Sequence, residues 1–467
     1  MLDGVDIKKL ALEVFPLFII LIGVVLVSFS LGPYQNWDTQ LEFEAASNVA
    51  KVGIPYVESF GTVIDQPPLG FYIEALFFSI FGMSADTGVI LVTLFGLGST
   101  VLMYLIGKDM YGRSTGLFAA ALFGLNSWHL VLSRSFLIDA QCLFFSLLCL
   151  HVGVLAIRRG SVKLALASGL AFAAAMLTKF YAVFILIPLL LFYMHSKPKN
   201  LKRILSQLAA FSMPVLVFAV TWYQTFLGRS LLSIFHHNDF LDVIPASVGV
   251  VASPFFATNF LIDYGLGPAF IAATVFSLLL AFSLRNYFSK TAIVDLTWLV
   301  SIVFVVSVNV VLGAVLNLNV PYFSAIKYLY HALPFFVLLT ASLSTESLSL
   351  FRAAKSTLQP RKLVLYAVAT AALVMLAASL ISSMYHTNAI SPRDYLQFRV
   401  ERDVDYGYAL LNPTPTVAGS PLITLQYCGF AMVLSGLLWA GRYRLTQLLL
   451  KNNQQLFIKT ATCIVSL

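Results

Sequence analysis

Charged residues are scarce in this chain of 467 residues: Asp, Glu, Lys and Arg make up 11% of it, and hydrophobic residues make up 59%. Soluble domains usually carry about 25% charged residues. So low a content excludes a domain whose whole surface is covered by water. Segments rich in Gly and Ser or in Gln and Asn are lacking too, and no repeat of about 20 to 50 residues recurs. These absences exclude a disordered linker protein and a solenoid.

The sequence also lacks the cysteine spacing of a metal site or a disulfide framework. Its cysteines, Cys142, Cys149, Cys428 and Cys463, form no C-x-x-C pair and no His-spaced pattern. We therefore interpret them as small packing residues. The run HHND at 236–239 allows a metal site, but a loop that contacts an acceptor or a lipid is the favoured interpretation.

Long apolar stretches are what the sequence has in abundance. A helix crosses the hydrocarbon core of a bilayer with about 20 apolar residues, and about 12 stretches of the chain come near that length. They lie at 11–31, 87–107, 115–132, 136–157, 162–177, 180–194, 204–227, 264–284, 293–317, 328–345, 363–383 and 421–440. The sequence therefore predicts an all-α integral membrane protein with about 12 transmembrane helices.

The positive charges are distributed unevenly between the two sides of these spans. With the N-terminus placed in the cytoplasm, 21 of the 29 Lys and Arg fall in cytoplasmic segments, as the positive-inside rule requires. This distribution predicts a multi-pass protein of the cell membrane with both termini in the cytoplasm. The same distribution explains the net charge of +8, because the cytoplasmic cations contact membrane lipids. A nucleic acid partner is not needed to explain it.

Three stretches are then left on the outer face, at 32–86, 228–263 and 384–420. Within the first of them, residues 69–81 are apolar but too short to span the bilayer, and they contain Glu74. This pattern favours an amphipathic helix that lies along the membrane interface.

Ionisable residues gather on the predicted outer face. Cations stand at the mouths of spans and acids lie beside them, at Arg134, Lys179, Lys327, Asp38, Asp65 and Asp139. Such groups are costly at membrane depth, so by default they mark a functional site. Each also has a purely structural interpretation. Asp139 would pair with Arg134 to tie down a loop, the two lysines would extend to lipid headgroups, and Asp38 would cap a helix.

Taken together, carboxylates that face cations at a water-membrane boundary suit a reaction on a phosphate-linked lipid. Such chemistry needs a base to deprotonate an acceptor hydroxyl or amine, and cations to balance the charge of a departing phosphate. Both residue types are present on this face.

Five local motifs occupy the same positions. The first two, WDTQLEFEAASNVAKVG and IDQPPLGFY, place Asp38 and Asp65 in the first outer loop, the latter followed by Gln66, Pro67 and Pro68. The other three are LSRSFLIDAQCLFF around Arg134 and Asp139, MLTKFYAVFILIP around Lys179, and IKYLYHALPFF around Lys327 and Tyr328.

In this order the motifs resemble those of the GT-C superfamily of polytopic glycosyltransferases, in the branch of protein O-mannosyltransferases and lipid A aminoarabinose transferases. The resemblance covers about residues 10–345. It implies a transmembrane catalytic module over 1–345, with interfacial helices in loop 32–86. Residues 346–467 would add transmembrane helices, the outer loop 384–420 and a cytoplasmic tail. The lack of room for a large lumenal domain favours a prokaryotic or archaeal enzyme.

The resemblance also implies a reaction and roles. A sugar, mannose or a related one, would pass with inversion from a polyprenyl-phosphate donor to a protein, lipid or glycan acceptor on the outer face. Asp38 would orient or deprotonate the acceptor, Asp139 with Arg134 would shape the donor side, and Lys179 and Lys327 would hold the lipid phosphate.

The sequence departs from the family pattern beside the expected base. Thr39 replaces a Glu, and Glu42 stands where a Tyr is common, so Glu42 or Glu44 is a candidate substitute. The family includes metal-dependent and metal-independent members. Asp38, Asp65 and Asp139 offer oxygen ligands but form no dense cluster, so a divalent metal is left open and no cofactor is assigned.

Two other functions fit a protein with about 12 spans. A secondary transporter usually has ionisable residues near the bilayer midplane and halves related by symmetry, whereas this chain concentrates them at one face. A non-catalytic lipid-binding subunit would keep the fold without turnover, and the changes at Thr39 and Glu42 are compatible with it. The enzyme, a hexosyl- or pentosyltransferase, is the favoured interpretation.

Overall fold

A computed structural model gives the fold of this chain. It describes residues 7–30, 37–58, 61–64, 66–196, 200–220, 292–315, 329–354 and 428–437, with the single positions 222, 271 and 274. In these parts the chain is helical except for one short hairpin.

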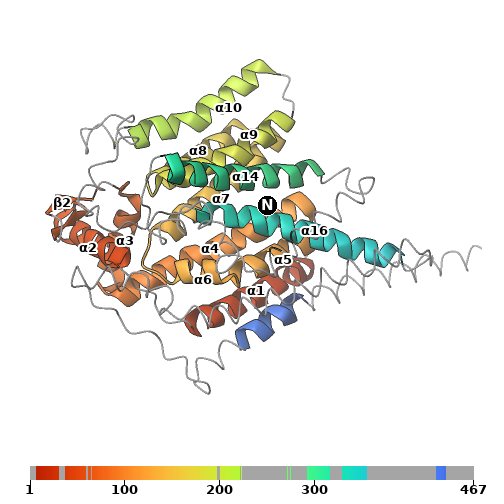
Figure 1. Cartoon of the computed structure of the whole chain (residues 1–467), viewed down its shortest axis with the longest axis horizontal. Coiled ribbons are helices and arrows are strands. Elements are labelled where there is room, and N and C mark those ends of the chain that lie inside the picture. Colours follow the sequence, from red (N-terminus) through yellow and green to blue (C-terminus); the bar gives the residue numbers. More distant parts are fainter. Residues whose placement is uncertain are drawn as a thin grey trace, which may run out of the picture.

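A bundle of long helices forms most of the described structure, and Figure 1 shows them side by side in one common direction. The chain runs through α1 (Ile7–Ser30), α4 (Ala85–Tyr111), α5 (Arg113–Gly124), α6 (Ser127–Ser133), α7 (Asp139–Arg159) and α8 (Val162–Met176). It continues through η2 (Phe180–Ile185), α9 (Leu186–His195), α10 (Leu201–Pro214), η3 (Val215–Val220), α14 (Ala292–Val315), η6 (Tyr330–Ala332) and α16 (Leu333–Ala354).

A smaller unit, which we call the end module, sits at one end of this bundle (Figure 1). It consists of α2 (Trp37–Val52), the antiparallel strands β1 (Tyr56–Val57) and β2 (Thr62–Val63), and α3 (Leu69–Phe81). Its own core includes Phe71 and Phe78 of α3, which pack with Phe136 from the turn before α7. The end module is therefore fixed to the bundle beside the start of α7.

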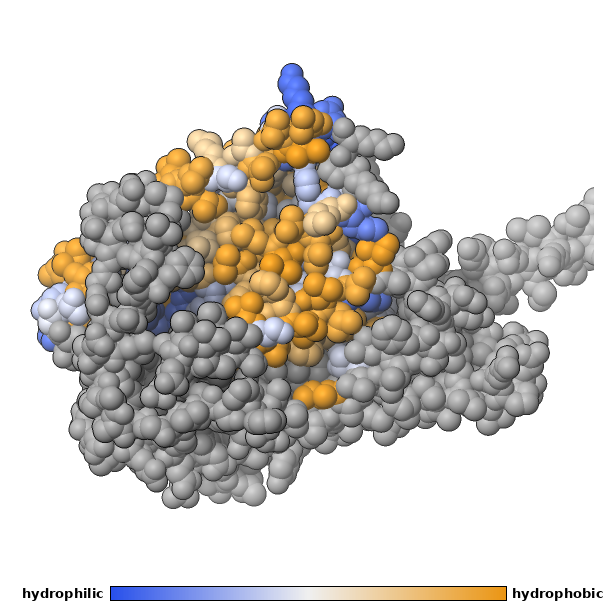
Figure 2. Space-filling model, turned by 45° about the horizontal axis from the view of Figure 1, so that its top comes forward, coloured by the Kyte–Doolittle hydropathy of each residue, from blue (hydrophilic) through white to orange (hydrophobic). Residues whose placement is uncertain are grey.

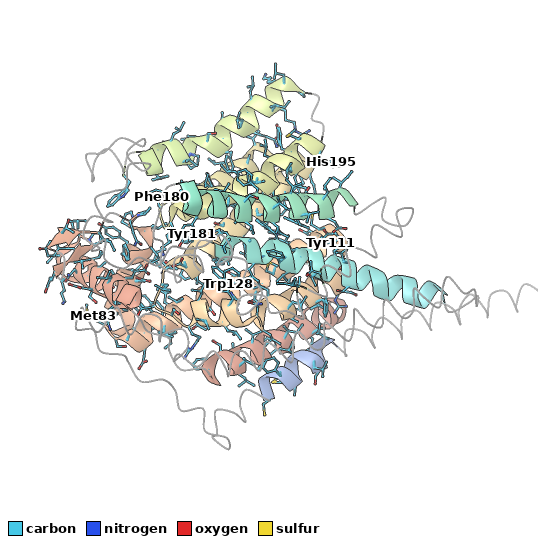
Figure 3. All side chains as sticks on the ribbon, in the orientation of Figure 1. Met83, Tyr111, Trp128, Phe180, Tyr181 and His195 are labelled. Carbon is cyan, nitrogen blue, oxygen red and sulfur yellow. The ribbon has the colours of Figure 1, made fainter. Side chains whose placement is uncertain are left out.

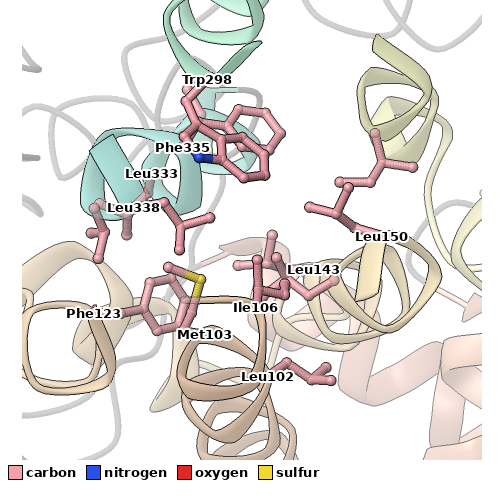
Figure 4. Close-up of a cluster of buried hydrophobic side chains, with 14 of the residues drawn as sticks. Leu102, Met103, Ile106, Phe123, Leu143, Leu150, Trp298, Leu333, Phe335 and Leu338 are labelled. Carbon is pink, nitrogen blue, oxygen red and sulfur yellow. The ribbon is translucent and has the colours of Figure 1, made fainter. Parts of the chain in front are cut away.

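The main core lies between α4, α5, α7, α14 and α16 (Figure 4). Trp298 of α14 stacks on Phe335 of α16 with ring centroids 5.7 Å apart, and both are fully buried. Gly107 of α4 and Gly116 of α5 let these helices approach closely, since a Cβ on Gly107 would lie 2.9 Å from the Cα of Gly116. Small residues at such crossings are typical of helix pairs in membranes.

Three helical stretches are long and apolar enough to cross a membrane: Ala85–Tyr111, Asp139–Arg159 and Leu201–Phe218. Seven shorter apolar helices accompany them in the described residues. Exposed apolar side chains include Leu205 of α10 and Val303 of α14. In the view of Figure 2 the described surface is largely apolar. These features are those of a multi-pass membrane protein.

The expected spans mostly coincide with helices in the described residues. The prediction of a single helix over 115–132 is wrong. It is divided into α5 and α6 at Leu125 and Asn126. The Asn126 side chain accepts hydrogen bonds from the backbone N–H groups of Trp128 and His129 at 3.0 and 3.3 Å. An Asn in this position caps a new helix, which is why the apolar run does not continue as one.

Other expected segments lie outside the described residues. These are the spans at 264–284 and 363–383, and the outer loops at 228–263 and 384–420. Of the span expected at 421–440, residues 428–437 are a described helix. It packs on α1, where a Cβ on Gly23 would lie 2.5 Å from the carbonyl oxygen of Gly429.

Candidate active site

The candidate site is built at the first turn of α7, where three segments far apart in sequence meet. The end module reaches this turn through α2 and α3. The turn after α8 reaches it from the other side, and the backbone N–H of Leu69 donates to the carbonyl of Leu177 at 2.9 Å. This bond joins the segment IDQPPLGFY to the segment MLTKFYAVFILIP at the edge of the site.

Asp139 is the first residue of α7, and its side chain is completely buried. Its Oδ2 lies 2.5 Å from Nζ of Lys179, and the hydroxyl of Tyr181 donates to its Oδ1. A buried carboxylate with a cation and a hydroxyl donor stays ionised more easily than an unpaired one. Figure 3 shows Tyr181 at the end of the bundle that carries the end module, away from Tyr111 and His195.

Glu42 brings a second carboxylate from α2. It is 1% exposed, and its Oε1 lies 3.4 Å from Nζ of Lys179. Its Oε2 accepts a hydrogen bond of 2.8 Å from the backbone N–H of Ile138. A negative charge at the N-terminus of α7 is favourable, because the unpaired N–H groups there carry partial positive charge.

Glu74 of α3 adds a third acid to the same turn. Its side chain is fully buried, and its Oε1 accepts a hydrogen bond of 2.7 Å from Nε2 of Gln141. Burial raises the pKa of Glu74 well above its ordinary value of 4.5, and the nearby charge of Glu42 raises the pKa further. Gln141 and Lys179 act in the opposite direction by smaller amounts. Burial and the Glu42 charge thus favour the protonated form of this carboxyl group.

Behind Asp139 the site continues into η6 and α7. The rings of Tyr181 and His331 meet edge to face with centroids 5.1 Å apart. Nε2 of His331 lies 3.3 Å from Oγ of Ser146 and 3.6 Å from Sγ of Cys142. His331 follows the motif residues Lys327 and Tyr328 by a few positions, so the fifth motif adjoins the site through described residues.

Arg134 lies in the turn that precedes α7. Its guanidinium carbon is 5.4 Å from the ring centroid of Phe29 in α1, a cation-π arrangement. Burial lowers the pKa of Arg134, and the charge of Asp86 at the start of α4 opposes that shift. Asp139 forms an ion pair with Lys179, which is 40 residues away in sequence.

The structure brings together the predicted residues Glu42, Asp139 and Lys179. Pro67 and Pro68 are buried, and Gln66 is partly buried, in the segment that enters α3. Asp65, Lys327 and Tyr328 lie outside the described residues, as does the side chain of Asp38. The alternative base Glu44 is engaged elsewhere, because its Oε1 accepts from the backbone N–H of Glu58 at 2.6 Å.

Four residues of the site were not predicted: Glu74, Gln141, Tyr181 and His331. The sequence marks Glu74 as the charged residue of an apolar interfacial helix but assigns it no role in the site. Tyr181 and His331 lie within two of the motifs, two residues after Lys179 and four after Lys327, so their proximity to the motif residues was the available signal.

Metal-binding side chains do not gather in the described residues, which hold no group of three or more His, Cys, Asp or Glu placed to bind an ion. The run at 236–239 lies outside them. The described site offers the Lys179 ammonium between two buried carboxyl groups, next to a third buried acid. Such an arrangement can hold an anion and accept a proton within a few ångströms of each other.

Several known proteins are similar to this chain. A family model described as dolichyl-phosphate-mannose-protein mannosyltransferase matches residues 65–223. The putative mannosyltransferase YkcB of Bacillus subtilis is 26% identical over 214 residues, which cover 44% of this chain and 30% of YkcB. The putative mannosyltransferase YycA of the same organism is 26% identical over 160 residues, which cover 34% of this chain and 23% of YycA. The matched region thus spans less than a third of either relative.

Among solved structures, ArnT from Cupriavidus metallidurans in the apo state is similar with a TM-score of 0.50. The similarity covers 91% of this chain and 75% of ArnT at 15% sequence identity, so it concerns the fold. The resemblance that the sequence predicts, to the protein O-mannosyltransferase and aminoarabinose transferase branch of the GT-C glycosyltransferases, is therefore confirmed.

Proposed function

We propose that this chain is an inverting glycosyltransferase that moves mannose or a related sugar from a polyprenyl-phosphate carrier to a protein, lipid or glycan acceptor. The observation that carries the proposal is the position of Lys179. Its ammonium lies between the buried carboxylates of Asp139 and Glu42, at the end of the bundle where the mannosyltransferase-like segments meet.

The reaction is a single displacement at the anomeric carbon. The acceptor oxygen or nitrogen forms a bond to this carbon while the bond to the phosphate oxygen breaks, and polyprenyl phosphate leaves with the bonding electrons. The acceptor proton passes to a carboxylate of α2, which is Asp38 or, one helical turn later, Glu42. General base catalysis of this kind contributes about 10² to 10⁴ in rate.

Lys179 holds the departing phosphate together with Lys327, and Arg134 and Tyr328 complete the donor side. Asp139 keeps the Lys179 ammonium in place before the donor arrives, and the phosphate then competes with Asp139 for that ammonium. Asp65, Gln66 and the two following prolines form the wall of the donor site that continues into α3.

The reaction site is on the outer face of the membrane. The support for this side is the course of α7, which begins at the site with Asp139 and ends with Arg158 and Arg159. Lys163 follows in the first turn of α8. Because cationic turns stay in the cytoplasm, the opposite end of α7 faces outwards.

Release of polyprenyl phosphate tests the proposed function directly. The full chain in nanodiscs is incubated with polyprenyl-phosphate mannose, glucose and aminoarabinose, with a membrane extract as the source of acceptor. We expect release with one of these donors, and a loss of about 10² to 10⁴ in rate for Asp38→Asn and Asp139→Asn.

Asp109→Asn is the matched control, because Asp109 lies near the C-terminal end of α4, away from the candidate site. Its Oδ2 is 3.7 Å from Nδ1 of His151. This variant should retain the wild-type rate. A chain that binds polyprenyl phosphate but releases none from any donor would be a lipid-binding subunit, and the proposed enzyme would be wrong.

A further inference from the structure

Glu74 and Gln141 contain two buried oxygen atoms that lack partners. Within the part of the chain that the structure describes, neither Oε2 of Glu74 nor Oε1 of Gln141 accepts or donates a hydrogen bond. Both side chains are fully buried, so neither oxygen is exposed to bulk water. Unpaired polar atoms are rare in protein interiors and call for an explanation.

The two oxygens belong to groups that already share one hydrogen bond. Nε2 of Gln141 donates to Oε1 of Glu74 at 2.7 Å, and each unpaired oxygen is the second atom of the same carboxyl or carboxamide group. As a carboxylate, Glu74 is only an acceptor, and so is the oxygen of Gln141, so these two atoms cannot pair with each other. A proton on Oε2 of Glu74 turns it into a donor, which Oε1 of Gln141 can accept.

We propose that Glu74 is a permanently protonated acid that forms a cyclic, two-hydrogen-bond pair with Gln141. The pair fixes the first turn of α7 against α3. Glu74 is then a positioning residue for the glycosyl transfer proposed above. The acid-amide pair itself does not depend on that function, whereas its effect on the transfer rate does. The charged groups around the pair are Glu42 of α2, Lys179 of the turn before η2, and Asp139 at the start of α7.

The proton on Glu74 has a consequence for the charge of the site. With Glu74 neutral, Glu42 and Asp139 are the ionised carboxylates that Lys179 faces. An ionised Glu74 would add a third negative charge where the lipid phosphate must bind. It would also compete with Asp139 for Lys179. The neutral acid therefore keeps the site receptive to an anionic donor while still closing the gap between α3 and α7.

Infrared spectroscopy of the full chain in nanodiscs tests the proton without any substrate. At neutral pH we expect the C=O stretching band of a protonated carboxyl group in the wild type, and its loss in Glu74→Gln. Glu58→Gln is the control, since Glu58 is exposed and its removal should leave the band unchanged. No such band in the wild type, or a band that survives in Glu74→Gln, would overturn the inference.

Transfer rates of two variants separate a positioning role from an ionised catalytic carboxylate. The amide in Glu74→Gln can donate to Oε1 of Gln141 and accept from its Nε2, so it preserves both hydrogen bonds. We expect transfer within about threefold of the wild type for this variant, and a loss of about tenfold or more for Gln141→Leu. A loss of about tenfold or more in Glu74→Gln would instead make the ionised form functional and refute the inference.

The two proposals fail in different ways. A chain that shows the Glu74 band but transfers no sugar would refute the proposed function and leave the acid-amide pair intact. A chain that transfers sugar but lacks the band would refute the pair alone.

Discussion

Gly70 of α3 approaches Ile138 so closely that a Cβ atom on Gly70 would lie 2.5 Å from Cγ2 of Ile138. Ile138 is also the residue whose backbone N–H holds the Glu42 carboxylate. The contact between α3 and the turn before α7 thus adjoins the hydrogen bond that positions Glu42. A larger side chain at Gly70 should therefore displace the groups that position the Glu42 carboxylate.

Gly70→Ala tests this relationship. The added methyl group must displace Ile138 or α3, and overpacking of this kind costs about 1 to 3 kcal/mol. We expect a lower Tm and a slower sugar transfer, because the N–H of Ile138 moves away from Glu42. Ser79→Ala, on the exposed side of α3, should change neither quantity. Wild-type values for Gly70→Ala would show that α3 has room to shift.

Lys179→Met tests the ammonium as the shared counter-ion of Asp139 and Glu42. Lys179 is 6% exposed, and removal of one partner from a buried ion pair costs about 3 to 5 kcal/mol. Denaturant unfolding in mixed micelles measures the change. The double variant with Asp139→Asn should be more stable than Lys179→Met, because it removes one of the stranded charges. Additive losses in the double variant would mean that the two residues are not coupled.

Charge in an apolar chain points to candidate site residues, but not to the contacts that each of them makes. The proximity of Asp139 and Arg134 in sequence suggested that they bond to each other. The structure gives Asp139 a partner 40 residues away, Lys179, because α7 starts at Asp139 while the turn after α8 returns to the same level. Sequence separation does not reveal where two antiparallel helices end relative to each other.

The sequence predicts the helix over 69–81, but not where its Glu74 side chain points. The exposed face of the helix is apolar, with Leu76, Ile80 and Phe81 each at least 64% exposed, while Glu74 is at 0%. Where the surroundings are lipid, a polar residue turns towards the protein. The burial of Glu74 therefore fits a helix at a membrane.

Tyr181→Phe tests the hydroxyl that donates to Asp139. The ring contact with His331 remains in this variant, whereas the carboxylate loses one of its two described donors. We expect a stability loss of about 1 to 3 kcal/mol, as for a hydrogen bond to a charged group, and a transfer rate lower by about tenfold. In the control, Tyr193→Phe, the lost hydroxyl has no hydrogen-bond partner among the described residues, so transfer should persist. Equal rates for both variants would exclude a role for the Tyr181 hydroxyl.

The pH dependence of stability provides an independent test of Glu74. Its pKa in the folded protein is raised well above 4.5 by burial and by Glu42, so the native state holds a proton that the unfolded chain releases. Stability from this group is complete below the unfolded pKa and declines as pH rises towards the folded pKa. Glu74→Gln keeps the hydrogen bonds and removes the titration. The Tm of the wild type should therefore fall relative to that of Glu74→Gln as the pH rises above about 4.5, the ordinary pKa of a Glu carboxyl group. Parallel curves of Tm against pH for the two proteins would show that Glu74 has the same protonation in the folded and unfolded states. A Tm difference that grows towards acid pH would mean that Glu74 is ionised in the folded protein.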